Sequence, residues 1–300
     1  MSFRTDTKPL LRRKVDLSRC TTMHVGGPAA YFIEPLTEDD VFEAVHFAKS
    51  EKLPYILLGR GSNLIFPDAG YQGVVISMNR FQNGNILFDP DFPIVHCSAG
   101  TQLSRLATAC RDRNLGGVEF LSTIPGSVGG ALAMNAGFSR HPGQPNEIGD
   151  IVNDVTIISE DGKKQTLQKN ELSFSYRQSS LKGKIILSAS FRLWHGRNED
   201  IDREIRANFD YRTQEQDVRY PSSGSIFKNP TPGVSAGKLI DQFGLKGMRI
   251  GDAMISPAHA NYMVNLGRAK SSDFVELIHQ VKKVVFDGTG FALETEVIFV

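Results

Sequence analysis

The segment EFLSTIPGSVGGALAMNAG (119–137) carries four glycines among apolar and small residues. Glycine weakens both helices and strands, so this composition predicts an irregular backbone. The segment is nevertheless too apolar for a free linker. A backbone that passes close to a flat, partly apolar, phosphorylated cofactor would have this composition, and the segment therefore predicts one wall of a cofactor site.

A second glycine-rich segment, GRGSNL (59–64), follows the apolar strand predicted for PYILL (54–58). Gly59 and Gly61 permit backbone conformations closed to other residues, and successive N–H groups there could form an anion-binding concavity. The alternative is a tight turn between strands, which is the commoner meaning of an isolated GxGSN pattern. Two such segments together favour a shared dinucleotide, although neither has the Rossmann pattern GxGxxG.

The rest of the chain mixes strands and helices, which indicates the α+β class. Thr37 is a helix cap ahead of Val41, Val45 and Ala48 at helical spacing, and Asp161-Gly162 is a hairpin tip. Two helices are expected to start at Thr37 and Thr101, and three more are expected over 199–217, 236–244 and 272–286. The expected strands cover 29–35, 54–58, 71–77, 92–98, 184–193 and 292–300, and a hairpin covers 155–167.

Composition excludes several classes of protein. The 34 basic and 33 acidic residues balance, so no basic field indicates nucleic acid. The N-terminus lacks the apolar core of a secretory signal, and no apolar run approaches the ~20 residues of a membrane span. Cys20, Cys97 and Cys110 are far apart and the histidines are scattered. This usage predicts a reducing cytoplasm and no metal site.

The stretch YPSSGSIFKNP (220–230) has two interpretations. Proline, serine and glycine are typical of a solvated turn. The other interpretation is that a glycine turn presents one serine to a ligand, with Lys228 and Asn229 holding the ligand's polar groups. Upstream, the charged segment WHGRNEDIDREI (194–205) indicates a domain boundary.

Seven motifs occur in one order, and together they resemble the UDP-N-acetylenolpyruvoylglucosamine reductase family from Thr21 to Val300. They are TTMHVGGPA (21–29), LGRGSNL (58–64), EFLSTIPGSVGGALAMNAG (119–137), FSYRQSSL (174–181), YPSSGSIFKNP (220–230), AGKLIDQFGLKGMRIGDAMISPAHANYMVN (236–265) and ALETEV (292–297).

The resemblance implies an FAD-binding fold of the vanillyl-alcohol-oxidase type in two subdomains, 1–75 and 76–196, and an α+β substrate domain over 197–300. It implies a cytoplasmic flavoprotein oxidoreductase of peptidoglycan synthesis that reduces UDP-N-acetylglucosamine enolpyruvate to UDP-N-acetylmuramate. It implies non-covalent FAD and NADPH as the reductant. We further expect a monomer or a weak homo-oligomer. The short helix before Tyr220 indicates the family's shorter type, which lacks a tyrosine-bearing loop.

The resemblance also implies the catalytic residues. Arg177 would stabilise an enolate-like intermediate, Ser225 would donate a proton, and Glu296 would complete the group. Each residue has a purely structural alternative. Arg177 could be a surface arginine beside Tyr176, Ser225 could cap the turn, and Glu296 could be a solvent-facing glutamate. Strand alternation puts Glu294 and Glu296 on the same face, so the choice of Glu296 depends on the family's Glu-Val step.

Binding residues follow from the same motifs. Lys228 and Asn229 would hold the substrate's diphosphate-sugar end. The other implied substrate contacts are Tyr176, His259 and Asn261, although His259 could equally be structural. The implied FAD contacts are Gly59, Arg60, Gly61, Ser62, Asn63, Leu64, Glu119, Thr123, Ile124, Pro125, Gly126, Val128, Gly129, Gly130, Asn135, Ala136 and Gly137.

One departure from the family pattern concerns the substrate phosphate. Related short sequences read KQP where this chain reads Glu215-Gln216-Asp217, and a carboxylate cannot replace that lysine. Arg212 or Arg219 would then substitute, or Lys228 would act alone. Two rival functions stay open: another FAD-dependent oxidase of the same fold, and a nucleotide-sugar sensor that has lost its flavin.

Overall fold

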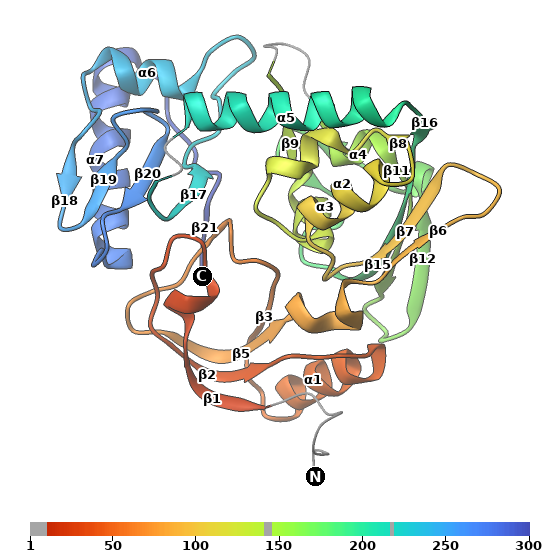
Figure 1. The fold of residues 1–300 in the computed structure, drawn as a ribbon. Coiled ribbons are helices and arrows are strands. Elements are labelled where there is room, and N and C mark those ends of the chain that lie inside the picture. The colour runs from red at the N-terminus through yellow and green to blue at the C-terminus, as the bar shows by residue number, and fades with distance from the viewer. Residues whose placement is uncertain (1–10, 141–145, 217–218) are drawn as a thin grey trace. The chain divides into compact units, whose positions relative to one another are not determined.

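A computed structural model describes residues 11–140, 146–216 and 219–300 (Figure 1). The chain forms two compact units that alternate along the sequence. Unit 1 contains the described residues of 1–13, 31–60 and 73–211, and unit 2 contains those of 14–30, 61–72 and 212–300. The predicted three-part division at residues 75 and 196 stays a prediction.

Unit 1 contains a five-stranded antiparallel sheet of order β12-β11-β15-β7-β6. The central strand β15 is buried on both faces rather than on the single face that its alternation predicts. Helices α2 and α3 supply part of this cover (Figure 1). The bounds are β6 Ile86–Phe88, β7 Ile94–Ser98, α2 Leu103–Arg111, α3 Val128–Met134, β11 Val152–Ile158, β12 Lys164–Gln168 and β15 Ile185–Arg192.

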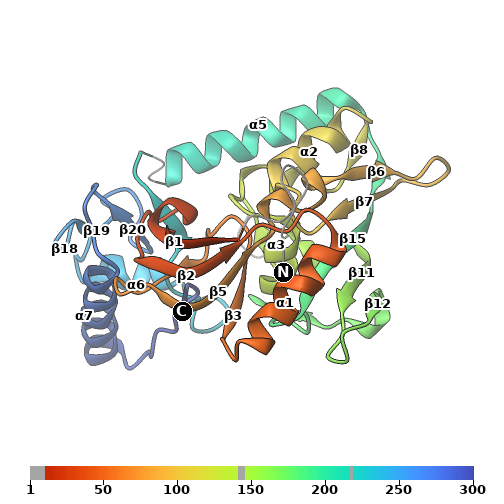
Figure 2. The same cartoon turned by 90° about the horizontal axis from the view of Figure 1, so that it is seen from below.

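A second sheet has the order β1-β2-β5-β3, and the apolar face of α1 packs on it (Figure 2). Thr37 caps α1 as predicted, because its hydroxyl accepts the Asp40 N–H. The bounds are β1 Arg12–Asp16, β2 Pro28–Ile33, α1 Glu38–Ser50, β3 Tyr55–Leu58 and β5 Tyr71–Ser77.

The remaining elements of unit 1 include one long helix and several short pieces. The helix α5 is close to the one predicted over 199–217, and β13 and β14 form a short hairpin. The bounds are η2 Met78–Gly84, β8 Leu115–Gly116, η3 Glu119–Thr123, β9 Gly137–Phe138, β10 Asn146–Glu147, α4 Ile148–Ile151, η4 Lys169–Glu171, β13 Phe174–Ser175, β14 Gln178–Ser179, β16 Trp194–His195 and α5 Asn198–Glu215, whose last residues enter unit 2.

Unit 2 contains an antiparallel sheet of order β17-β20-β19-β18 and the helix α7. The apolar residues at helical spacing in α7, from Phe274 to Val285, are buried in the core of this unit as predicted. The bounds are η1 Leu17–Cys20, β4 Leu64–Ile65, β17 Ser222–Ser225, α6 Ala236–Gln242, β18 Arg249–Ile250, β19 Ala253–Ile255, β20 Tyr262–Asn265, α7 Ser271–Thr289 and β21 Ile298–Phe299.

Two local predictions are wrong. Residues 128–134 form the helix α3 despite Gly129 and Gly130, because Val128, Ala131 and Leu132 are buried and tertiary packing outweighs propensity. The strand predicted over 292–300 shrinks to β21, because this segment changes partner. The Glu296 N–H bonds the Ile226 carbonyl oxygen, whereas the Ile298 N–H bonds that of Asn63.

The described residues contain neither a membrane-spanning helix nor a metal-binding cluster. No helix there is long and apolar enough to cross a membrane. No group of three or more histidine, cysteine or acidic side chains in that part of the chain could hold a metal ion.

Candidate active site

The glycine-rich segment 59–64 needs glycine for two different reasons. A Cβ on Gly59, in unit 1, would lie 2.3 Å from the Ser127 hydroxyl oxygen, so glycine lets the two glycine-rich segments approach each other. Gly61, in unit 2, has a φ of +64°, and its Cβ would lie 2.2 Å from the Cys20 carbonyl oxygen. Of these two glycines, only Gly61 adopts a conformation that is closed to most other residues.

Asn63 holds the C-terminal segment within unit 2. Its side-chain amide donates to the Glu296 carbonyl oxygen at 3.0 Å, and its own carbonyl oxygen accepts the Ile298 N–H at 3.0 Å. Ser62 is half-buried beside it, Arg60 is exposed, and Leu64 begins β4. These contacts connect the first motif of the predicted cofactor group to the backbone of a predicted catalytic residue.

The glycine-rich segment 119–137 contacts the turn between β7 and α2. Val128 and Gly129 donate their N–H groups to the carbonyl oxygens of Thr101 and Ala99, both at 2.9 Å. A Cβ on Gly129 would lie 3.0 Å from the Ala99 Cβ, whereas one on Gly130 would have only the Ser127 hydroxyl as a neighbour, at 3.5 Å. Among the other predicted cofactor residues, Val128 is buried, Pro125 is exposed, and Glu119, Ile124, Gly126, Ala136 and Gly137 are half-buried.

Thr123 supplies a polar group without a partner. Its hydroxyl oxygen is buried and makes no hydrogen bond with any described residue. A buried hydroxyl without a partner costs free energy, so a bound ligand that bonds it would stabilise the site. Asn135 is different, because its buried side-chain amide already forms hydrogen bonds with Glu147, Ser175 and Gly149. The cofactor contact predicted for Asn135 stays a prediction.

Arg177 lies in the two-residue turn of the hairpin β13–β14 with a φ of +56°. Its guanidinium donates to the Gly137 carbonyl oxygen at 3.3 Å, lies 3.9 Å from the Glu147 carboxylate, and is 5.0 Å from the ring centre of Tyr176. A non-glycine residue with positive φ is uncommon and is typical of sites where the surroundings fix a strained backbone. Only 20% of the Arg177 side chain is exposed, so it is more than a surface arginine.

The stretch 222–229 forms an irregular edge of the unit 2 sheet. Gly224 has a φ of +75°, and the pairing of β17 with β20 shifts between Ser222 and Ser225. Ser225 is half-buried opposite Tyr262. The side-chain amide of Asn261 brackets Phe227, accepting its N–H at 3.0 Å and donating to its carbonyl oxygen at 2.8 Å. Asn261 thus fixes the backbone just after Ser225.

The two glutamates near the C-terminus occupy different environments. Glu294 is exposed and lies 3.3 Å from the Lys228 ammonium nitrogen. Glu296 is half-buried, and its N–H donates at 2.7 Å to the carbonyl oxygen of Ile226, the residue after Ser225. The expectation that alternation places both on one face fails, since no regular strand covers 294–296. Glu296 is thus the less exposed of the two glutamates, and its role beside Ser225 stays a prediction.

His259 and Arg212 are the other polar groups of interest in unit 2. The ring nitrogen Nδ1 of His259 accepts the Asn261 N–H at 3.1 Å, and burial lowers the pKa of this histidine. Burial also lowers the pKa of Arg212, and no carboxylate of the described residues lies within ion-pair distance of its guanidinium. The Asn229 side-chain oxygen accepts the N–H of Ala236, the first residue of α6, at 3.0 Å. Asp217 lies outside the described residues.

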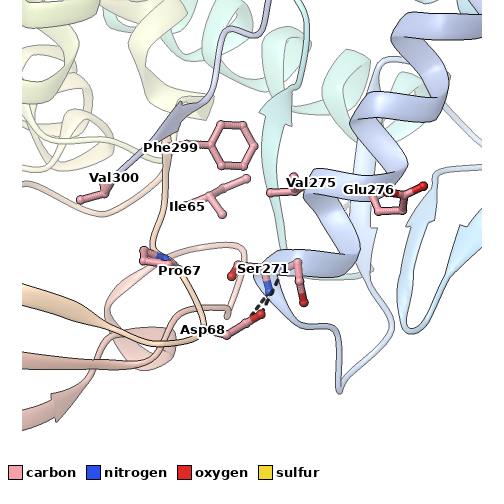
Figure 3. Close-up of a pocket in the computed structure, with 9 residues that line it drawn as sticks. Ile65, Pro67, Asp68, Ser271, Val275, Glu276, Phe299 and Val300 are labelled. Atoms are coloured by element: carbon pink, nitrogen blue, oxygen red, sulfur yellow. Dashed lines mark hydrogen bonds between the residues drawn. The ribbon is translucent and has the colours of Figure 1, made fainter.

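A cavity of about 340 Å³ in unit 2 contains none of these residues (Figure 3). Asp68 accepts the N–H groups of Ser271 and Ser272 at its edge, at 2.8 and 3.1 Å. Burial acts to raise the pKa of Asp68, but hydrogen bonds from the side chains and backbone of Ser272 and Ser271 outweigh it and hold the pKa below its usual value. The carboxylate therefore caps the first turn of α7.

Comparison with known proteins decides the family. Residues 29–168 match the model of an FAD binding domain, and residues 216–300 match that of the UDP-N-acetylenolpyruvoylglucosamine reductase C-terminal domain. The curated UDP-N-acetylenolpyruvoylglucosamine reductase of Syntrophus aciditrophicus (strain SB) is 40% identical over 94% of this chain and 89% of its own. The chain belongs to the UDP-N-acetylenolpyruvoylglucosamine reductase family.

Other relatives agree with this assignment. The reductase of Anoxybacillus flavithermus (strain DSM 21510 / WK1) is 40% identical over 92% of this chain and 90% of its own. The crystal structure of UDP-N-acetylenolpyruvylglucosamine reductase from Thermus caldophilus superimposes with a TM-score of 0.82 at 35% identity, and covers 97% of this chain and 99% of that chain. The predicted family and fold class are confirmed.

FAD fits the residues that this reductase-family chain presents. The unpartnered Thr123 hydroxyl, the contact of Gly59 with Ser127 and the open space above Gly130 all lie in the part that matches an FAD binding domain. Glycines let a backbone approach a flat ligand closely. The individual contacts remain predictions.

A glycine pair in α3 tests the cofactor contacts. We expect Gly130→Val to purify folded but pale, since its side chain meets no close protein atom and would occupy the space of the flavin. Gly129→Val would also be pale, but it presses on Ala99. Flavin absorbance per protein measures occupancy. Gly237→Val, in the first turn of α6 with its nearest neighbours 3.5 Å away, is the control and should stay yellow. A fully yellow Gly130→Val would contradict the assignment.

Proposed function

We propose that this chain reduces UDP-N-acetylglucosamine enolpyruvate to UDP-N-acetylmuramate with NADPH, through bound FAD, in peptidoglycan biosynthesis. The family membership supports this reaction, and so does one feature of unit 2. The backbone of Glu296 is hydrogen-bonded to the residue that follows Ser225, which keeps a carboxylate and a hydroxyl in adjacent segments. Cys20, Cys97 and Cys110 form no disulfide with any described residue, which fits the cytoplasmic location that we propose.

The reaction makes three demands on the site. Bound FAD supplies the hydride. An enolpyruvyl double bond accepts hydride only where negative charge can spread into the neighbouring carboxylate, and we assign Arg177 to stabilise that charge. The reacting carbon then needs a proton. We assign Ser225 as its donor, aimed by the Gly224 turn, with Glu296 beside it.

We further propose that Arg212 contacts the substrate phosphate where the family's lysine is replaced by Glu215. Arginine is rarely removed from water without a partner, and half-buried Arg212 has no carboxylate partner among the described residues. The guanidinium geometry matches phosphate. Lys228, whose side chain is 22% exposed and pairs with exposed Glu294, is the second basic contact.

Replacing Arg212 by glutamine should raise the KM for the nucleotide substrate by about tenfold or more, which corresponds to one lost hydrogen bond to a charged group. The value of kcat should change little, because the phosphate is remote from the reacting carbon. Adding Glu215→Lys to this variant should recover part of the affinity. Arg206→Gln, which removes an exposed pair with Asp202, is the control. An unchanged KM would assign the phosphate to Lys228 or Arg219 instead.

One experiment tests the overall reaction against both rival functions. Under anaerobic conditions NADPH should bleach the flavin absorbance, and the enolpyruvyl nucleotide should restore it. An oxidase of the same fold would recover its absorbance with oxygen and not with the nucleotide. A nucleotide-sugar sensor would purify without flavin absorbance at all.

A further inference from the structure

Glu147 is the carboxylate that faces Arg177 within unit 1. One of its oxygens lies 3.9 Å from the Arg177 guanidinium, and the other accepts a hydrogen bond from the Asn135 side chain at 2.5 Å. Only 17% of the Glu147 side chain and 20% of the Arg177 side chain are exposed. Partial burial strengthens the attraction between the two charges relative to a surface pair.

The strand pair β9–β10 places two acceptors on the same guanidinium. Gly137 opposes Glu147 in this ladder, and its carbonyl oxygen accepts from Arg177 at 3.3 Å. A Cβ on Gly137 would lie 2.9 Å from the Glu147 Cγ. The same Cβ would lie 2.5 Å from the Asn146 carbonyl oxygen, so glycine at 137 permits both the β9–β10 pairing and the close approach of the Glu147 side chain.

Asn135 connects this carboxylate to the turn that carries Arg177. Its amide nitrogen donates both to Glu147 and, at 2.9 Å, to the carbonyl oxygen of Ser175, while its amide oxygen accepts the Gly149 N–H at 3.0 Å. Asn135 is fully buried and has a left-handed φ of +46°. A single buried amide thus fixes both the Glu147 carboxylate and the backbone two residues before Arg177.

We propose that Glu147 is a positioning residue that, held by Asn135, orients the Arg177 guanidinium for the enolpyruvyl carboxylate. The inference depends on the role proposed above for Arg177. At 3.9 Å the glutamate attracts the guanidinium without forming a tight bidentate pair. The strained turn and the two acceptors select one orientation before substrate binds, which is the advantage of a preorganised charge.

The variant Glu147→Gln tests this arrangement with a nearly isosteric side chain. Its NH₂ group would face the guanidinium, or its single carbonyl oxygen would have to serve either Asn135 or Arg177. We expect NADPH to bleach the flavin at close to the native rate. Reoxidation by the enolpyruvyl nucleotide should slow about 10- to 100-fold, as expected for a misplaced catalytic group. Glu147→Asp should recover part of this rate, and Glu160→Gln on the exposed β11–β12 turn is the control.

A double-mutant cycle with Arg177→Gln separates this inference from the function it depends on. If Glu147 acts through Arg177, Glu147→Gln should cost nothing further in the Arg177→Gln background. Equal slowing in both backgrounds would overturn the inference, as would reoxidation of Glu147→Gln at the native rate, or a parallel loss in both half-reactions. A native reoxidation rate in Arg177→Gln alone would instead refute the proposed role of Arg177.

Discussion

Replacing Ser225 by alanine should leave the bleaching of bound flavin by NADPH at close to the native rate, and should slow reoxidation by the enolpyruvyl nucleotide at least ~100-fold. Reduction by NADPH needs no proton on the substrate. Reoxidation does, because the arrival of hydride leaves a basic carbon. The substitution removes one hydroxyl from a backbone that Glu296 and Asn261 fix just after Ser225, through Ile226 and Phe227. Stopped-flow absorbance follows the two half-reactions separately.

Two further variants sharpen this test. Cysteine at 225 should restore part of the reoxidation rate, since a thiol also donates a proton. Ser222→Ala, in the same strand and also half-buried, is the matched control and should behave like the native chain. If Ser225→Ala slowed the NADPH step, or left reoxidation unchanged, Ser225 would only support the turn at Gly224.

Features with local causes could be predicted from the sequence. The Thr37 cap, the Asp161-Gly162 hairpin tip and the apolar face of α7 each depend on residues a few positions apart, and the structure confirms them. The sequence does not predict the helix α3, because its glycines have low helix propensity. Burial of Val128 and Leu132 in the core nevertheless stabilises the helix. Propensity is a weak guide where tertiary packing is strong.

The candidate site shows the same limit. Asn261 and Phe227 are 34 positions apart in the sequence, so no local pattern predicts that the Asn261 side-chain amide hydrogen-bonds the Phe227 backbone. Glu147 was absent from every expectation, because its partner Arg177 lies in another hairpin. The only sequence signal was an acidic residue in NEIG, soon after the glycine-rich segment. Motif resemblance found the reacting groups, but the residues that orient them appear only in the folded chain.

Replacing Arg177 by glutamine should strongly slow the reoxidation of the flavin. We expect reoxidation by the enolpyruvyl nucleotide to slow about 10²- to 10³-fold, the usual cost of removing a preorganised group from a developing negative charge. NADPH should still bleach the flavin. Lysine should rescue poorly, since its point charge cannot reproduce the planar fork that reaches both Gly137 and a carboxylate. Arg192→Gln, at an exposed position of β15, is the control.

Arg177→Gly separates the role of this side chain in the reaction from its role in the fold. Glycine relieves the left-handed backbone at a φ of +56°, which costs other residues roughly 1–2 kcal/mol. That gain should offset the lost contacts with Gly137 and Glu147, so we expect the Tm of the glycine variant to stay within a few degrees of the native value. Reoxidation should nevertheless fall as far as in Arg177→Gln. A large fall in Tm would mean that Arg177 mainly holds the β13–β14 hairpin in place. Unchanged stability with lost reoxidation would mean that the chain accepts a strained turn there because the reaction needs a guanidinium.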